Sequence, residues 1–370
     1  MTNTTYVGMD AHKATIAVAM LLPSGELVEW QIANETVGVR RLARAIHRAA
    51  PGEVVACYEA GPCGFALQRQ LRAPGLDCRV IAPALIPQQP GNRVKTDRRD
   101  ARQLARLLRA DLLTAVHTPT PAQEAVRDLC RAREDAVEDR TRSRHRLSKF
   151  LLRLGIVDGP RQRWTQVYRR WLSTLRFDHA AAQATCDDYV RALDDLDDRV
   201  RTLDEQIALH ADTDAYREAV GVLRCFHGVD TLTALTFLAE LGDLTRFASA
   251  RQLMSYLDLT PSEFSSGPRQ RRGGITKAGN SHVRRILIEA AWHQRHRPGV
   301  GRRLQARRRG QPSWAVACAD RAQKRLHRRY QGLITRGKPS TVAAVAIARE
   351  LAAFLWAAVQ RLQQPAQVAA

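Results

Sequence analysis

The first 110 residues alternate short apolar runs of strand type with segments of helical length. Strands are predicted at Tyr6–Met20, near Glu26–Ile32, at Val54–Cys57 and at Cys78–Ile81, and a helix over Val37–Ala49. Pro23-Ser24-Gly25 separates the first two runs and indicates a hairpin turn. Because segments of helical length separate the later strands, we predict an α/β domain with a mixed sheet covered by helices.

The strand pattern ends near Pro121, and the chain to about His210 is predicted to be helical. Apolar residues recur there at spacings of four and three, as in a heptad repeat: Tyr189, Leu193, Leu196, Val200, Leu203 and Ile207. The other faces are rich in aspartate, as in a solvated coiled coil or an antiparallel hairpin. We favour an oligomerising coiled coil, and a helix packed within its own chain is the alternative.

The last third is predicted to be mainly α-helical. Two helical patterns between Val222 and Leu259 meet at Gly228-Val229-Asp230, which resembles a helix-hairpin-helix or is a generic interhelical turn. Arg349 and Glu350 interrupt the longest apolar stretch, which predicts a packed helix and not a membrane span. We therefore predict three regions, 1–115 (α/β), 116–218 (helical, coiled coil) and 219–370 (mainly α).

The distribution of basic and acidic residues indicates which class of partner the protein binds. The 370 residues include 58 Lys+Arg and 37 Asp+Glu, a net charge of +21, and the 45% hydrophobic content excludes a wholly disordered chain. The excess lies in 93–176 (21 basic, 10 acidic) and 269–338 (20 basic, 2 acidic), whereas 177–220 is acidic (4 basic, 12 acidic). Such basic blocks favour a nucleic-acid partner.

The cysteines and the N-terminus indicate a cytoplasmic protein. The seven cysteines are odd in number and form no C-x-x-C pair, which argues against a disulfide framework or a structural zinc site. The first residues lack the basic and apolar segments of a signal peptide. We expect reduced, mostly buried thiols in the cytoplasm.

Four acids are candidates for a metal site. Asp10 lies in or at the end of the first strand, and Glu59 directly follows the strand at Val54–Tyr58, so the two carboxylates meet if these strands are neighbours. Asp97 and Asp100 are three residues apart at the start of a helix that runs to Leu108. Clustered carboxylates repel each other unless a hard cation such as Mg²⁺ binds them, although first-turn helix acids are also common without a metal.

The segments Gly8-Met9-Asp10-Ala11-His12-Lys13, Glu59-Ala60-Gly61 and Lys95-Thr96-Asp97-Arg98-Arg99-Asp100-Ala101 resemble the DEDD domain of insertion-sequence IS110 family transposases. The resemblance implies an RNase H-like, RuvC-type fold and a Mg²⁺ site of one or two ions at Asp10, Glu59, Asp97 and Asp100. This chain departs from the pattern at Glu59-Ala60-Gly61-Pro62, where the family often has Glu-Ala-Thr-Gly, and at Ala82, where it has Asn.

A second motif lies in a loop rich in hydroxyls, glycines and cations, from Leu259 to Asn280. A serine beside a glycine presents its hydroxyl without crowding, and nearby cations suit a phosphate, but most such serines only form turns. The block resembles the C-terminal transposase domain of the same family, which implies that Ser266 is the nucleophile, with Ser265 as the adjacent alternative. The candidate nucleic-acid-binding residues are Arg269, Arg271, Arg272, Lys277, Arg284 and Arg285.

The resemblance implies a DNA recombinase that forms a phosphoserine intermediate, is guided by a non-coding bridge RNA encoded by the element, and works as a tetramer with composite active sites. One rival hypothesis is a RuvC-type nuclease that needs only the acids and cuts branched DNA by hydrolysis. Another is a non-catalytic nucleic-acid-binding protein that uses only the basic blocks.

Overall fold

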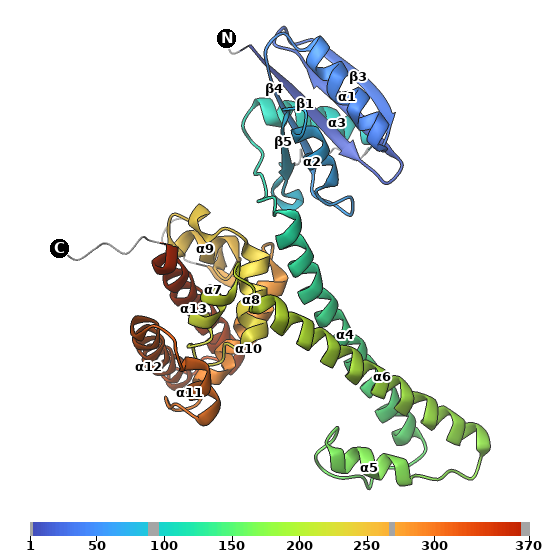
Figure 1. The fold of residues 1–370 in the computed structure, drawn as a ribbon, viewed down its shortest axis with the longest axis vertical. Helices are drawn as coiled ribbons and strands as arrows, with labels where there is room; N and C mark the ends of the chain where they lie inside the picture. The colour runs from blue at the N-terminus through green and yellow to red at the C-terminus, as the bar shows by residue number, and fades with distance from the viewer. Residues whose placement is uncertain (1–2, 88–95, 266–270, 364–370) are drawn as a thin grey trace, which may run out of the picture. The chain divides into compact units, whose positions relative to one another are not determined.

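The computed structural model describes residues 3–87, 96–265 and 271–363 and divides the chain into two compact units, Met1–Pro119 and Thr120–Ala370. Figure 1 shows the elements of both units. Those of the first unit are β1 (Thr4–Ala11), β2 (Thr15–Leu21), β3 (Leu27–Ala33), α1 (Thr36–Ala49), β4 (Glu53–Glu59), α2 (Ala66–Arg72), β5 (Asp77–Ile81), η1 (Pro83–Leu85) and α3 (Asp97–Arg109).

The first unit is built on a five-stranded mixed sheet with the order β3-β2-β1-β4-β5. Strands β1, β2 and β3 are antiparallel neighbours, whereas β4 pairs parallel to β1 and β5 pairs parallel to β4. The parallel pairs need crossovers, which α1 and α2 supply. The predicted mixed α/β sheet is confirmed.

The predicted turn at Pro23-Ser24-Gly25 joins β2 to β3. Gly25 has a φ of +92°, which glycine adopts without strain, and its N–H donates to the carbonyl of Leu22 at 2.9 Å. The predicted single run Tyr6–Met20 is wrong, because the chain reverses between β1 and β2 and the two halves pair with each other. An uninterrupted strand would have carried Asp10 into the middle of a sheet, whereas it lies next to the end of β1.

Each face of the sheet is covered by different helices. The side chains of Val7, Met9 and Ile16 pack with those of α1 and α2, and α3 covers the opposite face around Ala17 and Ala19. Gly8 permits the close approach of α3, since an added Cβ would lie 2.1 Å from the carbonyl oxygen of Ala101. This approach fixes where the first turn of α3 meets β1.

The second unit is almost entirely helical. Its elements are α4 (Pro121–Arg153), α5 (Gln166–Thr174), α6 (Ala180–Ala211), α7 (Arg217–Leu223), α8 (Thr231–Leu241), η2 (Leu244–Arg246), α9 (Ala250–Tyr256), β6 (Pro261–Glu263), β7 (Arg272–Ile275), α10 (Ser281–Trp292), η3 (His293–Arg295), α11 (Arg302–Arg308), α12 (Ser313–Thr335) and α13 (Ser340–Gln363).

Helices α4 and α6 form a long hairpin with α5 at its far end (Figure 1). Leu193, Val200 and Ile207 of the predicted heptad are buried, whereas Leu196 and Leu203 are half-buried. Arginines of α4 bind aspartates of α6, as in the pair Arg133–Asp204 at 2.8 Å. The heptad therefore serves packing within the chain, and an oligomerising coiled coil stays a prediction.

The remaining helices share one core around α13. By length and composition α13 is the one described helix that could cross a membrane, but half of its most apolar window is buried, and it packs against α7, α9, α10 and α12. The predicted turn at Gly228 joins α7 to α8, and an added Cβ there would lie 2.5 Å from the carbonyl oxygen of Ala290. All seven cysteines are free, and five of them are buried.

Candidate active-site residues

Two of the four predicted acids lie at neighbouring strand ends. In the parallel pair β1–β4, Met9 is opposite Tyr58, so Asp10 and Glu59 each follow by one residue. Parallel neighbouring strands end at the same edge of a sheet. The predicted meeting of these two carboxylates at one end of the sheet is therefore what the strand register produces.

The first turn of α3 brings Asp97 and a histidine to Asp10. Thr96 caps the helix by accepting a hydrogen bond from the backbone N–H of Arg99 at 3.4 Å. His12 Nε2 lies 3.5 Å from Asp10 Oδ2 and 3.5 Å from Asp97 Oδ1. Potential ligand atoms of Asp10, His12 and Asp97 all lie within 4.8 Å of one another.

Glu59 and Asp100 are near Asp10 but outside that group of three. Burial raises the pKa of Asp10; His12 opposes this, and the negative charges of Asp97, Asp100 and Glu59 add to it. The other three predicted acids thus all act on the carboxyl group of Asp10. We call the four predicted acids, Asp10, Glu59, Asp97 and Asp100, the acid cluster. Asp10 and Asp97 also belong to the group of three and therefore form the centre of the acid cluster.

Replacing Asp10 with Asn is expected to stabilise the metal-free protein at neutral pH. A carboxyl group whose pKa is raised on folding favours the folded state only below its ordinary pKa, here 3.8, and loses this contribution as the pH rises through the folded value. Asp10→Asn should therefore increase the free energy of unfolding at pH 7, by no more than about 1 kcal/mol after solvent screening. Urea unfolding in EDTA between pH 4.5 and 7.5 measures this difference.

The gain should shrink as the pH falls toward 3.8. Asp111→Asn makes the same charge change at an exposed position and serves as the control. A stability difference that is independent of pH, or a destabilised Asp10→Asn protein, would contradict the repulsion inferred for the cluster.

The predicted serine region flanks a two-stranded antiparallel ribbon. Glu263 of β6 pairs with Arg272 of β7, and the N–H of Phe264 donates to the carbonyl of Arg271 at 2.9 Å. Ser265 Oγ donates to Glu263 Oε1 at 2.8 Å and accepts a hydrogen bond from the N–H of Arg271 at 3.3 Å. Two of the predicted residues, Ser266 and Arg269, lie outside the described residues.

Arg284, a predicted nucleic-acid contact, is 8% exposed and holds the backbone that follows the ribbon. Its guanidinium donates to the carbonyls of Leu257 at 3.2 Å, Gly279 at 2.7 Å and Lys277 at 2.9 Å. Lys277 itself is exposed and has a φ of +65°. These bonds make Arg284 a residue that shapes the loop, and they leave its guanidinium turned inward.

The loop ends at a buried ion pair. Asn280 caps α10, and its Nδ2 donates to Glu240 Oε2 at 2.8 Å. The side chain of Glu240 is 1% exposed and accepts two hydrogen bonds from Arg131 of α4, at 2.6 and 2.8 Å. Removing one member of such a pair costs about 3–5 kcal/mol, because it leaves a buried charge.

A second contact ties α4 to α10. Glu134 binds His282 Nδ1 at 2.8 Å and Arg285 Nε at 2.5 Å. Arg285, another predicted nucleic-acid contact, also binds Glu289 at 3.0 Å. The carboxylates of Glu134 and Glu289 therefore already neutralise the charge of Arg285. By contrast, Arg271 is exposed and forms no ion pair with the described residues.

Sequence reasoning missed His12 and Glu240 as members of these groups. His12 follows Asp10 by two residues, the spacing that points side chains to the same side of an extended chain. Glu240 interrupts the apolar run of α8, and an acid within such a run signals a buried partner. The partner is Arg131 of α4, which lies 109 residues away in the chain, so the sequence near Glu240 does not identify it.

Two regions of the chain match models of known protein families. The family model DEDD_Tnp_IS110, described as a transposase, matches residues 7–156, and the model of the transposase IS116/IS110/IS902 family matches 221–306. The putative transposase y4qE of Sinorhizobium fredii is 44% identical over 362 residues, which cover 97% of this chain and 89% of the relative. The transposase for insertion sequence element IS1533 of Leptospira borgpetersenii is 37% identical over 339 residues, covering 90% of this chain and 97% of the relative.

The first matched region includes the sheet and the acid cluster, and the second includes the ribbon, the loop held by Arg284 and the capped start of α10. The N-terminal DEDD domain is accordingly RNase H-like, and the protein is an enzyme that acts on DNA. With both regions matched and with relatives that align along nearly the whole chain, this protein belongs to the IS110 family of transposases.

Proposed function

We propose that this transposase cleaves and rejoins DNA strands of an insertion sequence through a covalent phosphoserine intermediate at Ser266, with Mg²⁺ held by the acid cluster. The observation that carries the proposal is the convergence of Asp10, Glu59, Asp97 and Asp100 at one end of the sheet. Acids that raise the pKa of a half-buried neighbouring acid destabilise the folded protein. A functional role of these acids explains why the protein carries them in spite of this cost.

The residues of the cluster fit a divalent cation. Mg²⁺ prefers carboxylate oxygens, and Asp10 and Asp97 offer two within 4.8 Å of each other, with Glu59 and Asp100 as further ligands. His12 is better suited to a role as a charge partner of the acids, because imidazole is not a typical ligand of magnesium. Bound there, the cation would offset charge on the scissile phosphate and on the leaving oxygen.

The serine step conserves the energy of the phosphodiester bond. The Ser266 hydroxyl would lose its proton and attack the phosphorus, and the bond to the leaving deoxyribose oxygen would break, with that oxygen taking up a proton. A hydroxyl of the second strand would then attack the same phosphorus and release Ser266, so that the strands are exchanged without ATP. Next to Ser266 in the chain, Ser265 donates a hydrogen bond from its hydroxyl to Glu263 Oε1 at 2.8 Å, so a carboxylate lies beside the ribbon.

We further propose that an element-encoded bridge RNA selects the DNA sites and that the active form is a tetramer. The basic blocks at 93–176 and 269–338 supply charge for two nucleic-acid partners. The half-buried Leu196 and Leu203 leave part of the heptad available for contacts with another copy.

The test is to express the protein together with the noncoding DNA that flanks its gene, recover it under denaturing conditions and map DNA-linked peptides by mass spectrometry. We expect a nucleotide linked through a phosphodiester bond to Ser266. A link to Ser265 would correct the residue and retain the mechanism. Magnesium-dependent DNA breaks without any protein adduct would replace the proposal with hydrolysis by a RuvC-type nuclease.

A further inference from the structure

A separate group of cations lies where α7, α8 and α11 meet. We call it the α11 cluster and define it as Arg224, His227, Arg307 and Arg308. Arg224 directly follows α7, His227 lies in the turn before α8, and Arg307 and Arg308 are the last residues of α11. The His227 ring packs edge-on against that of His293, with centroids 5.7 Å apart.

Arg308 is the buried member of the cluster, at 9% exposed. Its Nε donates to the carbonyl of Cys225 at 3.0 Å, and its Nη1 donates to Asp320 Oδ1 at 2.8 Å. Its Nη2 is buried and has no partner among the described residues. A buried guanidinium donor without an acceptor is costly, so this atom indicates that an acceptor is missing.

Each of the other members also has one buried nitrogen without a partner among the described residues. Arg224 Nε, Arg307 Nε and His227 Nδ1 are buried without a hydrogen bond in the described part of the chain, and neither Arg224 nor Arg307 forms an ion pair there. Burial lowers the pKa of Arg307; Asp230 opposes this, and Arg224 and Arg308 add to it. Burial likewise lowers the pKa of His227, to which His293 and Arg307 contribute.

The acids near the cluster are already engaged. Asp320 binds Arg308, and Asp230 caps α8 by accepting a hydrogen bond from the N–H of Thr233 at 2.8 Å. The negative carboxylate of Asp230 lies at the N-terminus of α8 and binds the amide of Thr233 there, which disfavours a second anion at this helix terminus. An anion at this joint would have to be bound by the arginines.

We infer that the α11 cluster binds a phosphodiester group of the nucleic acid on which the transposase acts. Guanidinium groups bind phosphate oxygens in a fixed, bidentate geometry and are the side chains best suited to a partly buried anion. The charge also fits, since three arginines face two engaged acids. The inference needs only that the enzyme binds nucleic acid, and it holds whether or not Ser266 is the nucleophile.

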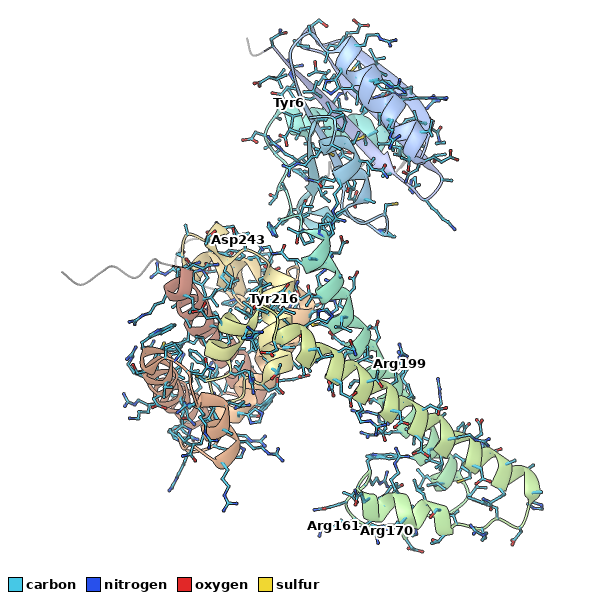
Figure 2. All side chains as sticks on the ribbon, in the orientation of Figure 1. Tyr6, Arg161, Arg170, Arg199, Tyr216 and Asp243 are labelled. Atoms are coloured by element: carbon cyan, nitrogen blue, oxygen red, sulfur yellow. The ribbon has the colours of Figure 1, made fainter. Side chains whose placement is uncertain are left out.

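Side chains tipped with nitrogen project from the part of the unit that holds α11 and α12 (Figure 2). Arg302 and Arg303, on the same helix as two members of the α11 cluster, are exposed and add further cations close to it in the chain. A phosphate bound at the α11 cluster would be one anchor of a longer backbone contact.

The test measures binding of the full-length protein to two fluorescent probes, a 30-base-pair DNA duplex and a single-stranded 30-nucleotide RNA. EDTA in the buffer removes any binding through a divalent cation at the acid cluster, and the repulsion by its carboxylates is the same in every variant. We expect Arg224→Gln combined with Arg307→Gln to weaken binding to at least one probe by roughly 10-fold or more and to lower its salt slope by about 1–2. The probe that is affected identifies whether DNA or RNA supplies the phosphate.

The control is Arg199→Gln combined with Arg201→Gln, which makes the same charge change on the acidic helix α6 (Figure 2 labels Arg199). An effect on both probes no larger than that of the control would overturn the inference. The test also includes thermal unfolding without nucleic acid. Because the double variant removes repulsion, its melting temperature should stay equal or rise, and a fall would assign the arginines a purely structural role.

Discussion

Asp97→Asn is expected to abolish DNA cleavage, with a loss of at least about 10³-fold in rate. The carboxylate of Asp97 lies at the centre of the acid cluster, where its oxygen is within 4.8 Å of an Asp10 ligand atom. Its side chain is 52% exposed, so the substitution should leave the fold intact. A cleavage assay on end-labelled DNA with and without Mg²⁺ measures the loss.

The control for this prediction lies at the other end of the same helix. Asp111→Asn removes one charge just beyond α3 and should retain the activity of the unmodified protein. If Asp97→Asn kept more than about a tenth of the activity, the acid cluster would not be the metal site, and cleavage would have to be assigned elsewhere.

Ser266→Ala is expected to eliminate both the covalent DNA adduct and strand exchange. No other group can form the phosphoserine link in the proposed mechanism, so the loss should reach the background of the assay. Ser265→Ala removes a hydrogen bond to Glu263 and one from Arg271, which brace the ribbon. Its effect should be about 10-fold, in keeping with the loss of roughly 1–1.5 kcal/mol of hydrogen bonding.

The pair of serine variants separates the two candidate mechanisms. DNA cleavage that persists in Ser266→Ala and leaves free ends would show that water is the nucleophile. Loss of the adduct in Ser265→Ala alone would assign the nucleophile to Ser265 instead of Ser266. Denaturing gels that resolve protein-linked from free DNA distinguish these results in one experiment.

Local patterns are sufficient to predict the elements that position the acids. The strands around Val7 and Val55 are apolar enough to be recognised, but only the structure shows that they are parallel neighbours, which places Asp10 beside Glu59. The helix that begins at Asp97 carries its own cap and its own amphipathic face. Local patterns therefore locate the elements that carry the four acids, whereas their assignment as one metal site rests on the resemblance to the family and stays a prediction.

Other features depend on contacts between distant parts of the chain. The sequence around Arg284 is that of a basic, exposed helix start, and only the packing of the loop shows that the guanidinium is turned inward onto three carbonyls. The bond between Arg131 and Glu240 spans 109 residues. The break between β1 and β2 has no local signal, because His12, Lys13 and Ala14 include neither glycine nor proline, the residues that usually mark a turn.

The hairpin of α4 and α6 offers a site for engineering. Its 33- and 32-residue helices run antiparallel for roughly 50 Å, and both contact α8 at the end where they join the rest of the unit. Removing or adding seven residues in each helix would preserve the heptad register and the pairing of arginines with aspartates. The far end, near α5, could then carry a fluorescent protein or an affinity tag at an adjustable distance from the core.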